Sequence, residues 1–481
     1  MIKTLVIINE PFEEMVVGKN TTLSYILGCS ELDFEIYIYN LPKTGDSFPS
    51  SLNQEVTLLC LSAKHGEILA RNYRKFNGQI KNLVDEKKYH ELQNLTPPRV
   101  LDILGKDFLT EKKLILSEIN FILQRIEPMK APFPPEGNKN VRQTLAQIKQ
   151  IFPHHIFNCP IEKKSDGSFV ELEDKETPRI INQIINQDIA TPTAEFRLHN
   201  PDFFQAISLM KQKYSEIFAA KKTKKIVIKP KNSAQSLGVF ALEFIGTGLD
   251  LKTVKSISVA KLAQGQIYKI SDELDQEELR QIIEILCYVQ RVKGSDNLLE
   301  KLGKRLIGEI NPNQIVEGAA ELYTAEILAQ PFLEGIKDGD IRANFSKDAA
   351  GNFYLAGCTF RNSAREESVD DFTTCYTSGG AVSKPIFVLS PQYKSALLEK
   401  CAVILRVLNA ELREKYQNSV ELGADFILVG DEKSVMLGEI NHHCPALLPI
   451  SEAMAGKENY DGGLGYAKRA IRDGLKLQSV L

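Results

Sequence analysis

Residues 423–445 read GADFILVGDEKSVMLGEINHHCP, and this stretch predicts a β-hairpin. Two runs of β-forming residues, Ala424–Val429 and Val435–Asn441, flank a five-residue turn at Gly430–Ser434. The turn is rich in Gly and in short or charged polar residues, which suit a chain reversal between two strands. We therefore expect two antiparallel strands joined by this turn.

The register of this hairpin decides which side chains meet. Pairing of Val429 with Val435 places Asp425 directly opposite Glu439, and the period of two places Asn441 on the same face as Glu439. Opposed carboxylates repel each other unless a cation lies between them, and oxygen ligands suit a hard ion such as Mg²⁺. The pattern predicts a metal site of Asp425, Glu439 and Asn441. A solvated hairpin whose acidic residues bind no metal stays open as the alternative.

Length and composition indicate an ordinary globular protein. The 481 residues, of which 43% are hydrophobic and 25% charged, are enough for two or three packed domains. The formal net charge of -3 gives no broad electrostatic footprint for nucleic acid or for an anionic membrane. No signal peptide and no run of the ~20 apolar residues that a membrane span needs is recognisable, so we expect a cytoplasmic protein. The cysteines form no C-x-x-C pair, which argues against a zinc or redox motif.

The first part of the chain predicts an α/β domain. An apolar strand at Thr4–Ile8, a helical pattern at Thr21–Cys29 and a strand at Phe34–Tyr39 make a β-α-β beginning, and Ile119–Leu123 is typical of another buried strand. Residues 42–98 are mixed and polar, and no element is assigned to them.

A second region begins near residue 177. A helical run at 178–187 precedes a β-hairpin candidate, in which Val227 and Ile228 lie on the first strand and Val239–Phe244 form the returning one. Between Thr247 and Ala325 we expect a segment with its own helices, most clearly Asp275–Val292, where Leu and Ile recur at helical spacing.

The chain contains neither G-x-x-x-x-G-K-[ST] nor a G-x-G-x-x-G that follows a strand, so a nucleotide would need another kind of site. Lys229 ends a strand and is followed at 231–238 by KNSAQSLG, whose short side chains let backbone N–H groups approach phosphate oxygens. An ordinary polar hairpin turn is the alternative. Residues 329–342 read AQPFLEGIKDGDIR, a strand, a linker, and then an acid and an arginine two residues apart.

Four motifs occur in a fixed order: IVIKP…GVF, AQPFLEGIKDGDIR, TFRN…YTSGG and GADF…GEIN. This series resembles the ATP-grasp fold and, within it, bacterial glutathione synthetase. The opening strand, the helix start at Lys19–Thr22 and the segment Arg125–Pro128 resemble the N-terminal domain of that family. Residues 42–115 and 247–325 have no clear counterpart.

The resemblance implies an α/β architecture with an N-terminal β-α-β domain followed by an ATP-grasp domain of two α+β subdomains. The N-terminal pre-ATP-grasp or substrate domain would comprise residues 1–165. The small ATP-grasp subdomain would comprise 166–335, with a lid hairpin at about 225–244 and a helical insertion at about 247–325. The large subdomain, 336–481, would carry the metal site.

The resemblance also implies roles for individual residues. The nucleotide would be bound by Arg179, which precedes the helix entering the ATP domain, by Lys229, Ser236 and Gly238 at the phosphates, by Gln330, Phe332 and Leu333 in an adenine-binding linker, and by Asp340 near the ribose. Arg342 and Arg361 would be the catalytic residues that hold the reacting carboxylate and the transferred phosphoryl group. Asp425, Glu439 and Asn441 would bind Mg²⁺ or Mn²⁺.

The implied activity is ADP-forming ligation of a carboxylate to an amine through an acyl phosphate, with γ-glutamylcysteine and glycine as the expected acid and amine. Another peptide and amino acid pair, a small-molecule kinase, and a nucleotide-binding regulator that has lost ligation remain as alternatives. The expected partners are small-molecule substrates, and a homo-oligomer stays open.

Overall fold

The computed structural model of the protein describes residues 2–8, 11–17, 21–41, 48–88, 91, 95–125, 144–152, 156–157, 161–163, 169–171, 175–197, 225–230, 239–244, 254–260, 267–270, 326–363, 381–385, 389–417, 419–430, 433–441 and 464–480. Its main helices are α1 (Thr21–Glu31), α2 (Ala63–Asp85), α4 (Val100–Leu104), α6 (Thr177–Ile185), α12 (Pro391–Ala410) and α14 (Leu464–Val480). Short 3-10 helices are η1 (Phe12–Glu14), η2 (Leu116–Glu118) and η5 (Glu334–Lys337). A small hairpin pairs β7 (Ile161–Lys163) with β8 (Phe169–Glu171).

The first sheet has the strand order β4-β3-β2-β1-β5-β6. Its strands are β1 (Lys3–Ile8), β2 (Glu35–Asn40), β3 (Glu55–Leu61), β4 (Leu109–Ile115), β5 (Phe121–Gln124) and β6 (Ile156–Phe157). Strands β2 and β5 pair in parallel with opposite sides of β1, so the strand order reverses at β1. The predicted β-α-β beginning is confirmed. In α/β sheets of this kind, ligands bind beyond the carboxyl ends of the strands where the order reverses.

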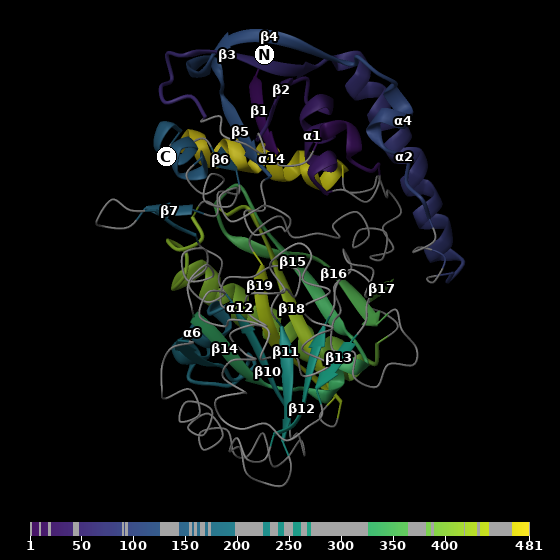
Figure 1. The fold of residues 1–481 in the computed structure, drawn as a ribbon, viewed down its shortest axis with the longest axis vertical. Coiled ribbons are helices and arrows are strands. Elements are labelled where there is room, and N and C mark those ends of the chain that lie inside the picture. Colours follow the sequence, from purple (N-terminus) through teal and green to yellow (C-terminus); the bar gives the residue numbers. More distant parts are fainter. Residues whose placement is uncertain are drawn as a thin grey trace, which may run out of the picture.

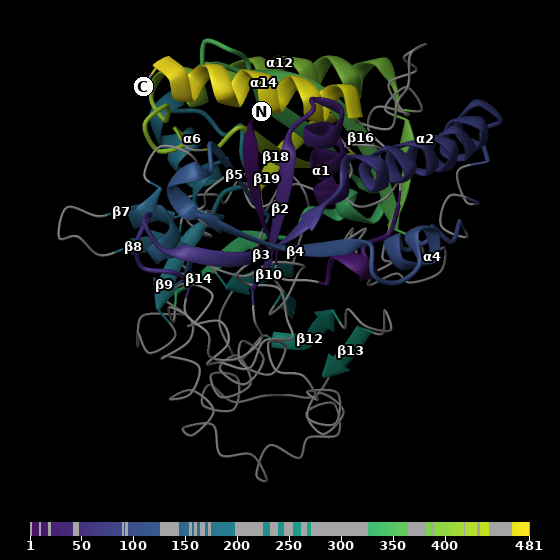
Figure 2. The same ribbon diagram turned by 90° about the horizontal axis from the view of Figure 1, so that it is seen from above.

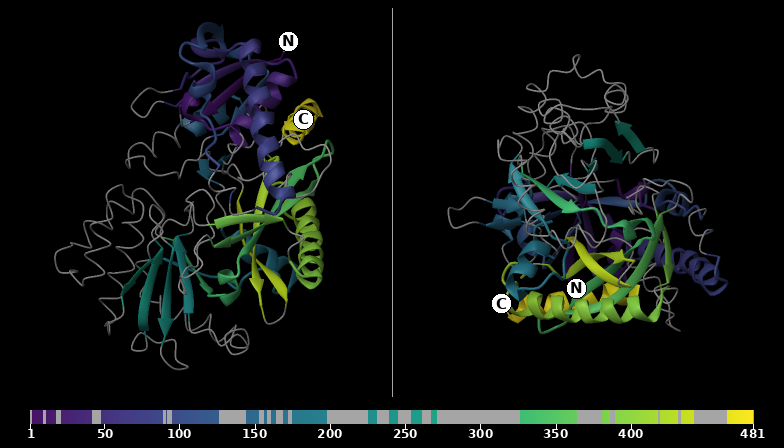
Figure 3. Two further views of the ribbon diagram at one scale, coloured as in Figure 1. Left: turned by 90° about the vertical axis from the view of Figure 1, so that its right-hand side faces the viewer. Right: turned by 90° about the horizontal axis from the view of Figure 1, so that it is seen from below.

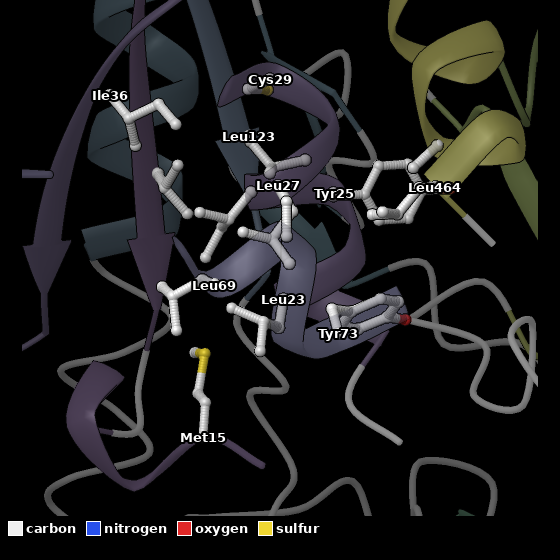
Figure 4. Close-up of a cluster of buried hydrophobic side chains, with 14 of the residues drawn as sticks. Met15, Leu23, Tyr25, Leu27, Cys29, Ile36, Leu69, Tyr73, Leu123 and Leu464 are labelled. Carbon is white, nitrogen blue, oxygen red and sulfur yellow. The ribbon is translucent and has the colours of Figure 1, made fainter. Parts of the chain in front are cut away.

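Both faces of the first sheet are covered. One face packs on α1, α2 and α14, whose apolar side chains form a single core with those of β1 and β5 (Figure 4). The other face packs on the helical residues 144–151 through Leu145 and Ile148. The segment 42–98, to which no element was assigned from the sequence, contains β3 and α2. Helix α2 begins at its N-cap Ser62, whose side chain accepts a hydrogen bond from the N–H of His65.

The second sheet is antiparallel and has the order β13-β12-β11-β10-β14-β9. Its strands are β9 (Ala194–Arg197), β10 (Lys225–Pro230), β11 (Phe240–Phe244), β12 (Val254–Ala260), β13 (Ile267–Ile270) and β14 (Glu326–Pro331). The predicted hairpin of β10 and β11 is confirmed. The insertion at 247–325 was expected to be helical, but its described part consists of β12 and β13, which extend this sheet. The predicted helix Asp275–Val292 lies outside the described residues.

The third sheet is also antiparallel, with the order β17-β16-β15-β18-β19. Its strands are β15 (Asp340–Lys347), β16 (Phe353–Ser363), β17 (Ala381–Pro385), β18 (Glu421–Val429) and β19 (Ser434–Asn441). Alternate residues such as Ile341, Ala343 and Phe426 pack on α6 and α12. The residues between them, which include Asp340 and Arg342, lie on the opposite face.

The first sheet, β1–β6, lies at one end of the long axis of the molecule, and the two antiparallel sheets occupy the rest of its length (Figure 1). The second and third sheets lie side by side below the first (Figure 3). Helix α14, which follows the third sheet in the sequence, packs on α1 of the first sheet (Figure 2). The chain therefore has an α/β fold, as predicted, while the domain boundaries remain predictions.

No helix in the ranges given above is long and apolar enough to cross a membrane.

Candidate functional site

The predicted carboxylate pair exists on the third sheet. Asp425 of β18 pairs with Glu439 of β19, as expected from the sequence. The predicted pairing of Val429 with Val435 is wrong, because Val429 pairs with Ser434 and the turn is one residue shorter. A β-bulge at Gly438 adds one residue to β19 and restores the expected register at the carboxylates.

Asn441 joins the two carboxylates. Its side-chain Nδ2 lies 3.1 Å from Asp425 Oδ2 and 3.1 Å from Glu439 Oε1. The three predicted metal ligands therefore converge, and their oxygen donors suit a hard cation. The site holds two carboxylates and one amide, and the described parts of the chain contain no group of three or more His, Cys, Asp or Glu side chains that could hold a metal ion.

Two arginines neutralise Asp425. Arg342 is the direct neighbour of Asp425 in the ladder between β15 and β18, and its Nε and Nη2 bind both carboxylate oxygens, the latter at 2.8 Å from Oδ2. Arg361 of β16 is paired with Asp340, and its Nε donates to Asp340 Oδ1 at 2.7 Å. Its Nη2 also lies 2.8 Å from Asp425 Oδ1. These four residues are all nearly buried and occupy one face of the sheet.

Gly339 holds this arrangement in place. Its φ of +128° is a conformation that only glycine adopts without strain, and a Cβ there would lie 2.3 Å from the carbonyl oxygen of Arg361. The glycine of the I-K-D-G-D-I-R motif thus lets the start of β15 approach β16 closely enough for Asp340 to meet Arg361.

Two lysines approach Glu439 from outside the third sheet. Lys229 Nζ, at the end of β10, lies 3.9 Å from Glu439 Oε2 and 3.5 Å from the carbonyl oxygen of Gly438. Lys175, just before α6, places its Nζ 4.0 Å from the same carboxylate oxygen. The second sheet thereby contributes a cation to the carboxylates of the third.

Burial and charge oppose each other at these groups. Burial lowers the pKa of Lys229 to about 8, although Glu439 partly offsets the effect. Burial alone would raise the pKa of Glu439, but the charges of Lys175 and Lys229 and the hydrogen bond from Asn441 outweigh it and lower that pKa to about 2. Glu439 is therefore ionised at neutral pH, as a ligand for a cation has to be.

Sequence reasoning missed Lys175 and chose Arg179 for the position before α6. The guanidinium of Arg179 pairs with Glu176 and lies 3.7 Å from Glu195, away from the ion pairs of Glu439. Lys175 precedes a helix that has Pro178 in its first turn, and that placement is the only signal that could have singled it out.

The predicted adenine linker connects the two sheets. Gln330 lies on β14, and its Nε2 donates to Thr193 Oγ1 at 2.8 Å. The next two side chains pack on different sheets. Phe332 packs with Ala241 of the second sheet, whereas Leu333 packs in a cluster with Met436 of the third. Two ammonium groups lie within 6 Å of the Phe332 ring, those of Lys225 at 5.6 Å and Lys337 at 5.9 Å.

Several predicted residues cannot be placed. Ser236 and Gly238 lie outside the described residues, as does the segment 364–380 that contains the Y-T-S-G-G motif.

Comparisons with known proteins give structural similarity only. No family model matches the chain, and no curated protein matches it. The D-alanine–D-alanine ligase from Coxiella burnetii is 8% identical, with a TM-score of 0.41, and the alignment covers 100% of this chain and 98% of that chain. D-alanyl-alanine synthetase A from Vibrio cholerae O1 biovar eltor is 10% identical, with a TM-score of 0.42, and the alignment covers 98% of this chain and 99% of that chain.

The D-alanine–D-alanine ligase from Bacillus anthracis, in a structure complexed with ATP, is 12% identical with a TM-score of 0.39, and the alignment covers 100% of this chain and 98% of that chain. At such identities and TM-scores these similarities carry no argument about activity. The case for function has to come from the residues and their geometry.

Proposed function

We propose that this protein is an ADP-forming ATP-grasp ligase that joins a carboxylate to an amine. The observation that carries the proposal is the convergence of Lys229 from the second sheet with Arg342, Asp425 and Glu439 from the third. These residues come from three of the four sequence motifs, and the proposed reaction needs cations and carboxylates at one point. The division into domains 1–165, 166–335 and 336–481 belongs to the same proposal.

The nucleotide would lie between the second and third sheets. Lys229 and Lys175 would bind its phosphates, and Gln330, Phe332 and Leu333 would line the adenine. We also propose that the phosphates contact Ser236 and Gly238 and that Asp340 lies near the ribose. Arg179 is proposed as a further nucleotide ligand. Lysine ammonium groups serve as point charges for phosphate oxygens, so they suit this role.

Asp425, Glu439 and Asn441 would hold Mg²⁺ or Mn²⁺. When bound, the metal would neutralise charge on the phosphates during phosphoryl transfer. In the structure, both oxygens of Asp425 accept hydrogen bonds from side-chain nitrogens, so at least one of these contacts has to change before that carboxylate can coordinate a metal.

Arg342 and Arg361 would orient the acid and stabilise the transferred phosphoryl group, because a planar guanidinium binds two oxygens and stays charged. A carboxylate oxygen of the acid attacks the γ-phosphorus of ATP, and ADP leaves. The amine nitrogen then attacks the acyl carbon and loses a proton, while phosphate departs with the oxygen it received from the acid. The protein contributes positioning and charge, and no covalent intermediate with a side chain is needed.

The finer proposal is a glutathione synthetase-like reaction that joins γ-glutamylcysteine to glycine in the cytoplasm. It rests on the order of the sequence motifs. The alternatives are another peptide and amino acid pair, a small-molecule kinase, and a nucleotide-binding regulator that does not ligate.

The test is to incubate the protein with ATP, Mg²⁺ and γ-glutamylcysteine, with and without glycine, and to measure phosphate and product masses. Glutathione and phosphate in equal amounts would support the finer proposal. A phosphorylated product without amide would favour a kinase. Tight ADP binding with no turnover of any acid and amine tested would favour a non-catalytic regulator.

A further inference from the structure

A buried polar cluster joins the first sheet to the third, away from the carboxylate pair. Arg125 Nη1 donates to Glu421 Oε1 at 2.6 Å, and the hydroxyl of Tyr25 donates to Glu421 Oε2 at 2.5 Å. The guanidinium of Arg125 also lies 5.0 Å from the centre of the Tyr25 ring, and its Nε donates to Thr22 Oγ1 at 3.2 Å. The side chains of Arg125 and Glu421 are 1% and 3% exposed.

Arg125 lies at the edge of the first sheet, and Glu421 lies at the start of a strand of the third sheet. Arg125 directly follows β5, and its N–H bonds to the carbonyl oxygen of Ile7 at 3.0 Å, so it sits at the carboxyl edge of the first sheet where the strand order reverses. Glu421 is the first residue of β18, and its neighbour Val420 packs in the core of the first sheet. Asp425 follows on the same face of β18, about 13 Å further along the strand.

The chemistry of the cluster favours a positioning role. A buried ion pair seldom stabilises a protein more than well-packed apolar side chains would, whereas its directional hydrogen bonds define one geometry. Burial, followed by the charge of Glu421, raises the pKa of Tyr25 well above its usual value, so the hydroxyl keeps the proton that it donates. The Tyr25 ring lies beside Leu464 of α14 (Figure 4).

We propose that Glu421, held by Arg125 and Tyr25, is a positioning residue for the acid substrate. It fixes the carboxyl edge of the first sheet relative to Asp425, so that an acid bound at that edge presents its carboxylate to Arg342. This inference rests on the proposed function, because it assumes that the acid reacts beside Asp425.

The test uses the full chain with tyrosine variants that are matched in burial. Tyr25→Phe removes one hydroxyl from the cluster. Tyr416→Phe is the control, because Tyr416 is also fully buried and its hydroxyl bonds Thr177 beneath the third sheet, away from the first. Glu421→Gln is the stronger variant, which keeps the shape and removes the charge. For each protein we would measure KM for γ-glutamylcysteine, the dissociation constant for ADP, and Tm.

Glu421→Gln should raise KM for γ-glutamylcysteine roughly tenfold or more, since small misplacements of reacting groups are costly. Tyr25→Phe should shift KM in the same direction by less, and ADP affinity should stay within about twofold in both variants, because the cluster lies apart from the proposed phosphate site. Tyr416→Phe should lower Tm without changing KM for the acid.

Two results would overturn the inference. One is an unchanged KM for γ-glutamylcysteine in Glu421→Gln, and the other is a loss of ADP binding equal to the loss of acid binding, with both losses following the decrease in Tm. A wild-type protein that binds ADP but turns over no acid would instead refute the proposed function, and the positioning role with it.

Discussion

The substitution Lys229→Met should change the affinities for nucleotide and for metal in opposite directions. In the structure Lys229 serves as a counter-ion to Glu439, with Nζ 3.9 Å from Oε2. In the proposed complex it binds phosphate instead. Removing the ammonium group deprives the nucleotide of a contact and at the same time frees the carboxylate for a cation.

The expected magnitudes follow from the charges. A charge-assisted hydrogen bond contributes about 1.5–3 kcal/mol, so ADP should bind roughly 10- to 150-fold more weakly. Two unit charges 3.9 Å apart interact by about 4 kcal/mol at an effective dielectric constant of about 20. That value is the upper bound on the gain in affinity for free Mn²⁺, because Lys175 still lies 4.0 Å from Glu439.

The assays are calorimetric titration with ADP in the absence of metal, and titration with Mn²⁺ followed by electron paramagnetic resonance in the absence of nucleotide. Lys347→Met is the matched control, because Lys347 is 5% exposed compared with 7% for Lys229. In the hydrogen bonds that the structure describes, the ammonium group of Lys347 donates to the carbonyl oxygens of Tyr416 and Gln417 and to no carboxylate. Unchanged ADP affinity in Lys229→Met, or weaker Mn²⁺ binding, would refute the reasoning.

Burial lowers the pKa of Lys347 from 10.5 to about 7, so below pH 7 the folded state carries the full cost of its charge, at most about 5 kcal/mol. The free energy of unfolding of the wild-type protein should therefore rise between about pH 7 and pH 10 relative to that of Lys347→Met. Urea unfolding at several pH values measures it, and an equal dependence on pH in the two proteins would contradict this prediction. Asp425→Asn should abolish Mg²⁺-dependent turnover and lower the free energy of unfolding by about 3–5 kcal/mol, because Arg342 and Arg361 lose their shared carboxylate; full activity would exclude the metal assignment. Gly339→Ala should destabilise the fold by about 1–3 kcal/mol through its positive φ and the contact with Arg361, whereas Gly78→Ala, with open space at its Cβ and a place within α2, should stabilise it by about 0.5–1 kcal/mol; equal Tm values for the two variants would show that the close approach at Gly339 is not constrained.

The predicted opposition of Asp425 and Glu439 is confirmed, but it was derived from a pairing of Val429 with Val435 that does not occur. The expected register holds at the carboxylates because the turn is one residue shorter than predicted and the bulge at Gly438 adds one residue to β19. The turn contains Lys433 at a φ of +46°, a conformation for which lysine has no preference. Turn composition therefore indicated a reversal without indicating its length.

The only local signal for Lys175 is its place before a helix that has Pro178 in its first turn, and the stretch around it is polar and contains several other charged residues. Only the packing of α6 against β19 brings it to Glu439. Helix α2 was missed for a different reason. Its buried residues Leu69, Tyr73, Phe76 and Ile80 recur at helical spacing, but charged residues between them lower the apolar content of the segment.

The most direct test of the central claim is to follow oxygen from the acid into phosphate. The carboxylate of γ-glutamylcysteine would be labelled with ¹⁸O, and phosphate released in the presence of ATP, Mg²⁺ and glycine would be analysed by mass spectrometry. The proposed acyl phosphate predicts one ¹⁸O atom in each phosphate formed together with an amide. Unlabelled phosphate accompanying amide formation would contradict activation of the acid by ATP.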